Sequence, residues 1–319
     1  MVTRGASSEL GSWQAWHDED RPLRLGVSSC LLGEQVRFDG GHKRDRFVAD
    51  VLDPWVEWVS ACPEKEIGMG VPRPTVRISD RDGEPRMIAP STGEDFTERM
   101  NEYAETRVGA LMDVDLDGYV LKKNSPSCGL MRIKVYKGEH PLHKKGVGLF
   151  AAVLTRRWPG LPVEEEGRLN DAPLRENFIE RIFARNRWRT LVRRGPSRRA
   201  LVAFHTAHKL LLLAHNEAAY RRLGRLVGEA GKTSDEELFR AYELEFQRAL
   251  ETRATVKKHC NVLQHAMGYL KRALPPAEKR ELESAIEDYR GGLLPLIVPV
   301  TLLRFNLRKH GIDYLLGQV

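Results

Sequence analysis

Three of the four cysteines stand where short apolar runs give way to turn residues, and this pattern constrains the fold more than any other feature. Cys30 lies in Val-Ser-Ser-Cys-Leu-Leu-Gly, Cys62 in Ser-Ala-Cys-Pro-Glu and Cys128 in Ser-Pro-Ser-Cys-Gly. An apolar run followed by glycine or proline is typical of a strand that ends in a turn. Because ligands gather at the carboxyl ends of strands in open α/β sheets, we expect the three thiols at one rim of a sheet.

The first half of the chain alternates short apolar segments with segments of helical periodicity. The spacing predicts strands at 23–28, 56–61 and 118–121 and helices at 46–59 and 99–112. Residues 146–154 fit either a helix or a strand. Such alternation predicts an α/β, Rossmann-like domain with an open sheet over residues 21–158.

The rest of the chain divides into an extension, a linker and a second domain. Residues 1–20 are typical of a flexible extension, and residues 159–174, rich in proline, glycine and glutamate, are typical of a linker. From 175 to 319 the pattern is helical throughout, which predicts an all-α domain. Within it, Ser234 and Glu237 have the spacing of a capping box.

Composition narrows the class of protein. Four cysteines in 319 residues are too few for a disulfide scaffold. The N-terminal segment lacks the apolar core of a secretory signal, and the longest apolar run, 293–303, is short and holds two prolines. We therefore expect a cytoplasmic protein without a membrane partner, in a reducing compartment where thiols can bind metal.

The charge is distributed unevenly between the two halves. Residues 1–174 hold 24 Lys and Arg against 28 Asp and Glu, whereas residues 175–319 hold 27 against 16. An excess of +11 in the second half favours a polyanionic partner, although basic helical faces are also common on ordinary solvated surfaces.

A run of arginines is the strongest candidate for contact with that partner. Trp188 stands within it, and arginine-rich helices with an aromatic residue suit phosphate backbones and base stacking. The candidate RNA-binding residues are Arg181, Arg185, Arg187, Arg189, Arg193, Arg194, Arg198 and Arg199.

The three cysteines allow several interpretations. They could be small buried side chains, a redox pair, zinc ligands or ligands of an iron–sulfur cluster, and their spacing alone does not decide between these. No C-x-x-C pair of the usual zinc pattern is present. Three thiolates can hold a cubane cluster and leave its fourth iron open as a Lewis acid for sulfur. Nearby, Glu64 could move protons and Ser125 could hold substrate or water, but Glu64 also fits the first turn of a helix and Ser125 an N-cap.

The first half resembles the thiouracil desulfidase family over residues 24 to about 158. The resemblance is carried by the motifs at 29–33, 36–40, 62–64, 72–73 and 125–129. It implies a 4Fe–4S cluster held by Cys30, Cys62 and Cys128, with one iron not ligated by protein. It also implies that Glu64 and Ser125 are catalytic and that water replaces the sulfur of a thiolated base. Arg73 and Lys123 are further candidates to line the site.

The second half resembles the YbgA-like helical domain family. The motifs stand at 204–209, 220–224, 259–265, 289–292 and 295–299. The fusion resembles bacterial desulfidases that act on 4-thiouridine in tRNA, which implies tRNA binding by the helical domain. The histidines in these motifs fit packing or phosphate contact better than metal binding, and Cys260 is not expected to be a cluster ligand.

Three alternatives to a tRNA desulfidase remain at this point. The substrate could be free thiouracil or a thionucleoside, or the chain could bind nucleic acid through a fold with a structural metal. The third alternative is an enzyme that inserts sulfur rather than removing it. Sulfur insertion normally calls for an activating nucleotide, and the sequence holds no P-loop pattern, which counts against this alternative. Desulfidation involves no net electron transfer, so we expect no obligatory redox partner. The sequence does not indicate an oligomeric state.

Overall fold

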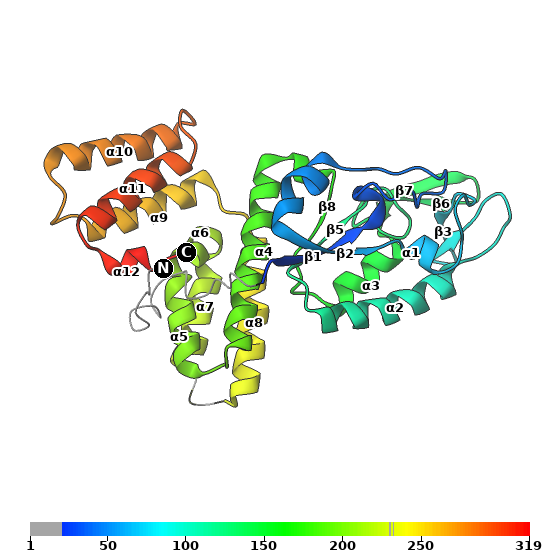
Figure 1. Cartoon of the computed structure of the whole chain (residues 1–319), viewed down its shortest axis with the longest axis horizontal. Helices are drawn as coiled ribbons and strands as arrows, with labels where there is room; N and C mark the ends of the chain where they lie inside the picture. The colour runs from blue at the N-terminus through cyan, green and yellow to red at the C-terminus, as the bar shows by residue number, and fades with distance from the viewer. Residues whose placement is uncertain (1–20, 230, 232) are drawn as a thin grey trace, which may run out of the picture. The chain divides into compact units, whose positions relative to one another are not determined.

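The chain, described by a computed structural model over residues 21–229, 231 and 233–319, forms two compact units that divide between Phe183 and Ala184. The first unit combines strands and helices, and the second is helical (Figure 1). Helix α4 (Ala172–Arg193) crosses the boundary. The prediction of an α/β domain followed by an all-α domain is confirmed, while the extension predicted at 1–20 lies outside the described residues.

A parallel sheet forms the centre of the α/β unit. Its strand order is β2-β1-β5-β8. The strands are β1 (Leu23–Ser28), β2 (Val56–Ala61), β5 (Gly118–Leu121) and β8 (Val163–Glu165). The first three have the predicted bounds. Because Ser28 pairs with Ala61 and Val27 with Val120, the carboxyl ends of three adjacent strands come together at one edge.

Alternation along the strands gives this sheet two buried faces. Tyr119 and Leu121 belong to a core that also takes in residues of α2 (Thr97–Val114) and α3 (Leu149–Arg157). Val27 and Val120 belong to a second core, which includes Phe178 of α4. A strand buried on both faces is apolar at nearly every position, which explains why these short segments could be recognised in the sequence.

The helix predicted at 46–59 is correct only in its first part. Residues Phe47–Leu52 form a single π-helical segment, η4, and Asp53–Trp55 a 3-10 turn, η5, before β2 begins at Val56. Pro54 lacks a backbone donor and its ring clashes with the preceding turn, so a regular helix cannot continue through it.

The linker predicted at 159–174 is wrong. This stretch contains β8, which pairs with β5, and a 3-10 turn, η6 (Arg168–Asn170). The two units divide after Phe183 instead. Proline, glycine and glutamate suggested mobility, but Glu165 and Glu166 are buried and accept hydrogen bonds, which a composition argument cannot detect.

A second sheet was not predicted. It has the order β4-β3-β6-β7 and consists of β3 (Arg77–Arg81), β4 (Glu84–Ile88), β6 (Ile133–Lys137) and β7 (His140–Gly146). Only a few of its side chains, among them Ile78, Met87 and Val135, enter the core. Charged residues interrupt each of these strands, so their apolar signal is weak.

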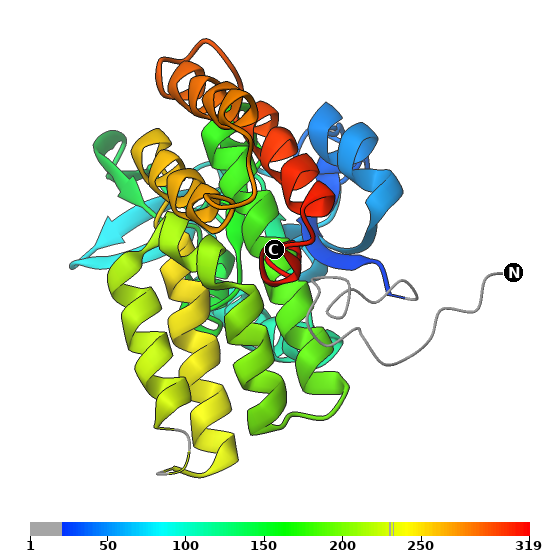
Figure 2. The ribbon, with the colours of Figure 1, turned by 90° about the vertical axis from the view of Figure 1, so that its left-hand side faces the viewer.

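The helical unit contains two cores, which Figure 2 shows as two groups of helices. The first group is α5 (Arg198–Ala207), α6 (Lys209–His215), α7 (Glu217–Gly228) and α8 (Asp235–Glu251). The second group is α9 (Val256–Tyr269), α10 (Pro276–Arg290), α11 (Ile297–Lys309) and α12 (Asp313–Leu316). The Ser234 hydroxyl accepts from the Glu237 amide at the start of α8, as the capping pattern predicted. No helix in the described part of the chain is long and apolar enough to cross a membrane.

Candidate active site

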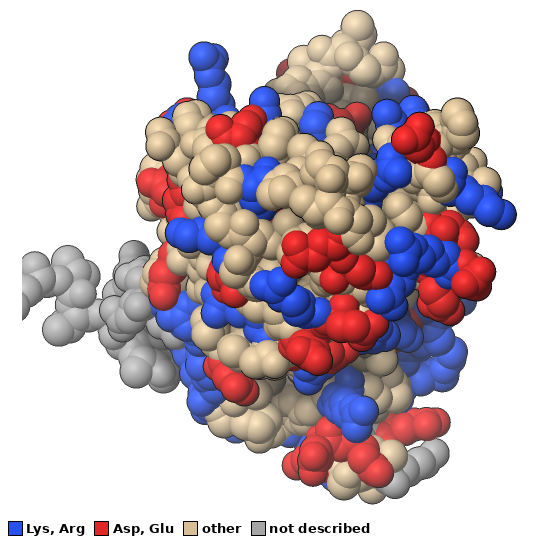
Figure 3. All heavy atoms as spheres, turned by 90° about the vertical axis from the view of Figure 1, so that its right-hand side faces the viewer, with Lys and Arg blue, Asp and Glu red and all other residues tan. Residues whose placement is uncertain are grey.

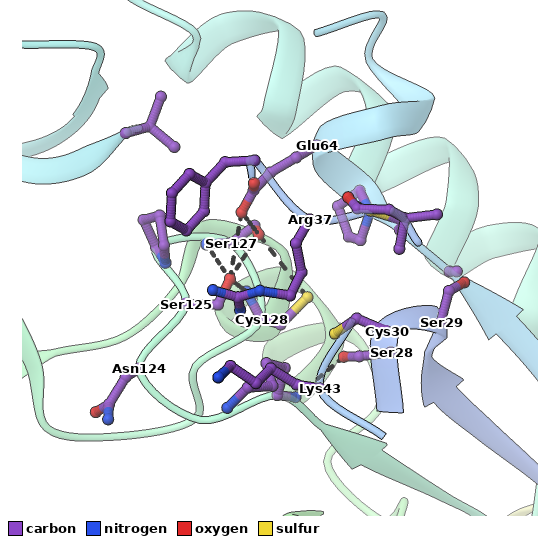
Figure 4. Close-up of a pocket in the computed structure, with 18 of the residues that line it drawn as sticks. Ser28, Ser29, Cys30, Arg37, Lys43, Glu64, Asn124, Ser125, Ser127 and Cys128 are labelled. Carbon is purple, nitrogen blue, oxygen red and sulfur yellow. Dashed lines mark hydrogen bonds between the residues drawn. The ribbon is translucent and has the colours of Figure 1, made fainter. Parts of the chain in front are cut away.

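The three predicted cysteines line one cavity of about 310 Å³ at the carboxyl edge of the parallel sheet (Figure 4). Cys30 lies in the 3-10 turn η3 (Ser29–Leu31) after β1, and Cys62 lies between β2 and α1 (Pro63–Glu66). Cys128 follows β5 and is buried. All three thiols are free. The prediction that the sheet brings these residues to one rim is therefore confirmed.

Burial raises the pKa of each of these thiols, and neighbouring charges or hydrogen bonds oppose it only in part. Burial raises the pKa of Cys30 to about 11, and the positive charges of Lys122 and Arg37 partly oppose it. Burial raises the pKa of Cys128 to about 12, against which the Ser28 hydroxyl donates a hydrogen bond to the sulfur. The pKa of Cys62 is also raised by burial. Free thiols here are thus protonated at neutral pH, whereas a bound metal deprotonates a coordinating thiol outright.

The Glu64 carboxylate is fixed by hydrogen bonds on both of its oxygens. Its Oε2 accepts from Arg73 Nε at 3.0 Å and from Nη2 at 2.7 Å. Its Oε1 accepts from the Ser127 hydroxyl at 2.7 Å. Arg73 also donates to the carbonyl of Val36, so the sequence motifs at 36–40 and 72–73 meet beside the cavity. This arrangement presents a charged, oriented carboxylate beside the three thiols.

Two serines share the loop that carries Cys128, and only one was predicted. The Ser125 hydroxyl accepts from the amides of Ser127 and Cys128, at 3.2 and 3.1 Å, and lies 3.4 Å from Glu64. Ser127 is 1% exposed and makes the shorter bond to Glu64. Ser125 therefore accepts hydrogen bonds from the loop backbone, as a capping serine does, and Ser127, which was not among the predicted site residues, holds the carboxylate.

Two buried glutamates hold the ends of the same loop. Glu166 accepts from the Lys123 amide at 2.7 Å and from the Lys122 ammonium at 2.5 Å. Glu165 accepts from the Leu130 amide at 2.8 Å. The supposed linker therefore supplies the residues that fix the loop around Cys128. Both Arg73 and Lys123 line the cavity, as expected of them.

The donor set fits an iron–sulfur cluster. Within the described residues, no three His, Cys, Asp or Glu side chains are grouped closely enough to hold a single metal ion. The three thiols instead surround a cavity with room for a group of several atoms. Thiolate sulfurs are the ligands that such clusters take, and hydrogen bonds such as that from Ser28 tune them.

We expect Gly148→Ala to disturb the loop around Cys128. A methyl group at Gly148 would lie 2.4 Å from the Ser127 carbonyl oxygen and 2.8 Å from the Gly129 amide nitrogen. Because these are backbone atoms, the loop must move, and overpacking of this kind costs about 1–3 kcal/mol. Urea denaturation measures the loss.

The matched control for this variant is Gly268→Ala in α9, where an added methyl group meets nothing within 4 Å. It should gain about 0.5–1 kcal/mol, because alanine favours the helix. An unchanged urea midpoint for Gly148→Ala would show that the loop tolerates the added group.

The predicted RNA-binding arginines do not form one surface. Arg185 and Arg189 are 3% and 4% exposed, so neither is available to a phosphate backbone, and this part of the prediction is wrong. Trp188 is 1% exposed and stacks on Tyr242 rather than facing solvent. Arginine-rich sequence alone could not separate residues that enter the core of a bundle from those that face water.

The other six arginines of the predicted set differ in their exposure and in their hydrogen-bond partners. Arg187 donates to the His208 ring at 3.0 Å, and Arg198 pairs with Asp235 at 2.7 Å. Arg181 is partly buried. The exposed members of the set, which remain candidates for RNA contact, are Arg193, Arg194, Arg198 and Arg199.

The four histidines of the sequence motifs make contacts within the helical unit. His205 shares a hydrogen bond with the Tyr242 hydroxyl at 3.0 Å, and His208 with the Phe204 carbonyl at 2.7 Å. His259 lies 2.7 Å from the Tyr289 hydroxyl, and the ring of His265 packs edge-on to Tyr269. Cys260 is buried in the second helical core and does not line the cavity of the α/β unit.

We expect acid to destabilise the helical unit through His205. Burial lowers the pKa of this side chain to about 4, whereas an unfolded histidine titrates near 6.5. The unfolded state therefore takes up the proton first, and stability falls as the pH drops from about 6.5 toward 4, by about 2 kcal/mol at pH 5. Urea denaturation at pH 7 and pH 5 measures this loss. His205→Gln should lose less, and an equal loss in both proteins would contradict the assignment.

Comparison with protein families divides the chain as the fold does. Residues 25–166 match the family model described as 2-thiouracil desulfurase. Residues 209–319 match a model described as a protein of unknown function, DUF1722. The first match ends at Glu166, so it includes the glutamates that hold the loop of Cys128.

Two curated proteins and one solved structure are similar to parts of the chain. The uncharacterized protein YbgA of Escherichia coli (strain K12) is 30% identical over 144 residues, which are 45% of this chain and 85% of that protein. The uncharacterized protein YbbK of Bacillus subtilis (strain 168) is 34% identical over 151 residues, 46% of this chain and 97% of that protein. The structure of the 4Fe–4S-dependent thiouracil desulfidase TudS is 32% identical, with a TM-score of 0.39, and covers 48% of this chain and 96% of that one.

Proposed function

Because the chain belongs to the 2-thiouracil desulfurase family through residues 25–166, we propose that it removes sulfur hydrolytically from 4-thiouridine in tRNA, using a 4Fe–4S cluster, and gives uridine and hydrogen sulfide. The observation that carries the proposal is the convergence of three free thiols and one fixed carboxylate on a single cavity. A packing role for the cysteines does not account for that carboxylate.

In this proposal Cys30, Cys62 and Cys128 hold the cluster by three of its irons. When bound, the cluster supplies a Lewis-acidic iron with affinity for a soft thione sulfur. Lys122 and Arg37 favour the thiolate form of Cys30, and the Ser28 hydroxyl favours that of Cys128.

Glu64 moves the protons of the reaction. Its carboxylate accepts a proton from the water that attacks the ring carbon, and Arg73 and Ser127 keep it oriented toward the cavity. The overall reaction consumes one thione and one water and gives one carbonyl and one hydrogen sulfide. Carbon keeps its oxidation state, so the reaction needs no reductant.

The preference for tRNA over a free thiobase rests on the charge of the second half of the chain. A small base makes no use of a domain with an excess of +11, whereas RNA releases counterions when basic side chains meet its phosphates. Arg193, Arg194 and Arg199 are exposed in the helical unit and are the residues we assign to that contact.

Replacing these three arginines by glutamine should weaken tRNA binding and flatten its dependence on salt. Each lost phosphate contact removes about 0.7–0.9 from the slope of log K against log salt, so the triple variant should lose up to about 2–3. Filter binding between 50 and 300 mM salt measures the slope. A triple variant of Lys137, Lys144 and Lys145, which are exposed on the second sheet of the α/β unit, removes the same charge and should leave the slope unchanged.

The decisive experiment is anaerobic. The full chain is reconstituted with iron and sulfide and incubated separately with tRNA that carries 4-thiouridine and with free thiouracil, while thiobase absorbance and hydrogen sulfide are followed. Sulfide released in step with loss of 4-thiouridine supports the proposal. If only thiouracil is turned over, the substrate is the free base and not tRNA. If tRNA binds but neither compound releases sulfide, the chain is a nucleic-acid-binding protein and not a desulfidase.

A further inference from the structure

We propose that Tyr269 and Tyr314 form a stacking platform for unpaired RNA bases on the second group of helices. Tyr269 is the last residue of α9 and Tyr314 lies in α12, the short helix near the end of the chain (Figure 1). This inference rests on the proposed function and deepens it, because it names the part of the RNA that the helical unit contacts: single-stranded nucleotides, in addition to phosphates of the duplex.

The two tyrosine rings stack on each other and are still open to solvent. Their centroids lie 5.5 Å apart and their planes are 29° from parallel. Tyr269 is 46% exposed and Tyr314 is 42% exposed. Each ring therefore covers one face of the other and leaves part of its surface for a ligand. Exposed aromatic faces are the surfaces on which proteins stack unpaired bases.

The other large aromatic residues of the helical unit do not offer such a surface. Trp188, which the arginine-rich sequence suggested for base stacking, is 1% exposed and packs against Tyr242 in the core. Phe305 is 63% exposed, but it has no ring partner among the described residues. The platform is thus a pair of rings brought together from two helices, which the sequence pattern alone does not reveal.

Uncharged side chains that can form hydrogen bonds lie beside Tyr269 on α9. Asn261, Gln264 and His265 are exposed, and their helical spacing puts them on one face. The ring of His265 lies edge-on to Tyr269, with 5.9 Å between centroids. A methyl group added at Gly268 would meet nothing within 4 Å, so this face of the helix is open. Amide and imidazole groups in such a place can bond to the edges of a stacked base.

The charge of this segment favours RNA over a protein as the ligand. Residues 252–277 hold five Lys or Arg and no Asp or Glu. Lys271 and Arg272 follow Tyr269 in the turn that ends α9; both are exposed, and neither forms a salt bridge within the described part of the chain. On the face of the molecule that Figure 3 shows, by contrast, acidic and basic side chains are interspersed. Unpaired cations next to exposed rings match a chain of bases and phosphates.

The test compares unpaired with paired RNA. Fluorescence anisotropy measures the binding of the full chain to a labelled oligouridine, to a blunt RNA duplex and to tRNA. Tyr269→Leu/Tyr314→Leu keeps apolar side chains between the two helices but removes the rings. We expect this variant to bind oligouridine and tRNA about 5- to 100-fold more weakly and the duplex as tightly as the native protein. Because no charge is removed, the slope of log K against log salt should not change.

Two further variants are the controls. Tyr269→Phe/Tyr314→Phe keeps both rings and should bind all three RNAs as the native protein does. Trp55→Leu removes a ring that is 71% exposed in the α/β unit, at the end of β2 opposite to Cys62, and should also leave the three affinities unchanged. Urea denaturation shows whether each variant is folded. The single variants Tyr269→Leu and Tyr314→Leu, each with a smaller expected loss, serve if the double variant is too unstable to measure.

The outcomes separate this inference from the proposed function. Equal affinity of the native protein and the leucine variant for oligouridine and tRNA overturns the platform, and the exposed rings would then fit a protein ligand. An equal loss on the duplex also overturns it, because a duplex presents no unpaired base, and so does a loss in the phenylalanine variant. Sulfide release is not part of the measurement. The binding data therefore decide on the platform even if no thiolated compound is turned over, and a platform that fails leaves the desulfidase reaction untouched.

Discussion

Cys128→Ala is expected to abolish sulfide release and to lower the iron bound per chain to background. Cys128 is the most buried of the three cavity thiols, and no fourth cysteine lines the cavity to replace it. A cluster held by two thiolates instead of three loses one of its anchoring bonds. Iron content and the visible absorbance of the reconstituted protein measure the loss directly, before any substrate is added.

Cys260→Ala is the control for this experiment, because Cys260 is also buried but lies in the second core of the helical unit. Its replacement should leave iron content and activity unchanged and cost at most about 1 kcal/mol of stability, through the small cavity it leaves. Full iron content and activity in Cys128→Ala would remove this residue from the ligand set. Equal iron loss in both variants would indicate that misfolding, and not ligation, decides the result.

The rim of three thiols could be predicted mainly because two of the strands that position them, β1 and β5, are buried on both faces. Val27 and Val120 lie in one core and Tyr119 in the other, so β1 and β5 are mainly apolar and their ends are sharp in the sequence. The turn residues after each strand then gave the positions of the cysteines. Local pattern and tertiary placement agree at this edge of the sheet, which is the condition under which sequence arguments succeed.

The supporting residues could not be predicted, because their roles depend on contacts distant in the chain. Glu165 reaches the Leu130 amide across 35 residues, and Ser127 reaches Glu64 across 63. A run of glutamates beside proline and glycine has the composition of a linker whether or not it accepts such bonds. Arg185 is the opposite case. Its charge suggested a residue on the surface that contacts RNA, but the side chain is buried in the helical unit.

Glu64→Gln is expected to lower kcat by a factor of about 10²–10⁴ while the protein still binds iron. The substitution keeps the shape of the side chain and removes the group that accepts a proton. It also leaves the Arg73 guanidinium, whose side chain is 3% exposed, without its carboxylate, and loss of one partner from a buried pair costs about 3–5 kcal/mol. Activity must therefore be measured on folded, iron-loaded protein.

Two further variants separate chemistry from stability at this position. Arg73→Met with Glu64→Gln removes both charges, so it should recover part of the stability and none of the activity. Glu84→Gln, at an exposed position on β4, removes one negative charge from the same unit and should match the native protein in both respects. If iron-loaded Glu64→Gln turns over within about threefold of the native rate, the proton must pass through another group. Ser127, which bonds to Glu64 and lies 2.9 Å from Ser125, is then the next residue to replace.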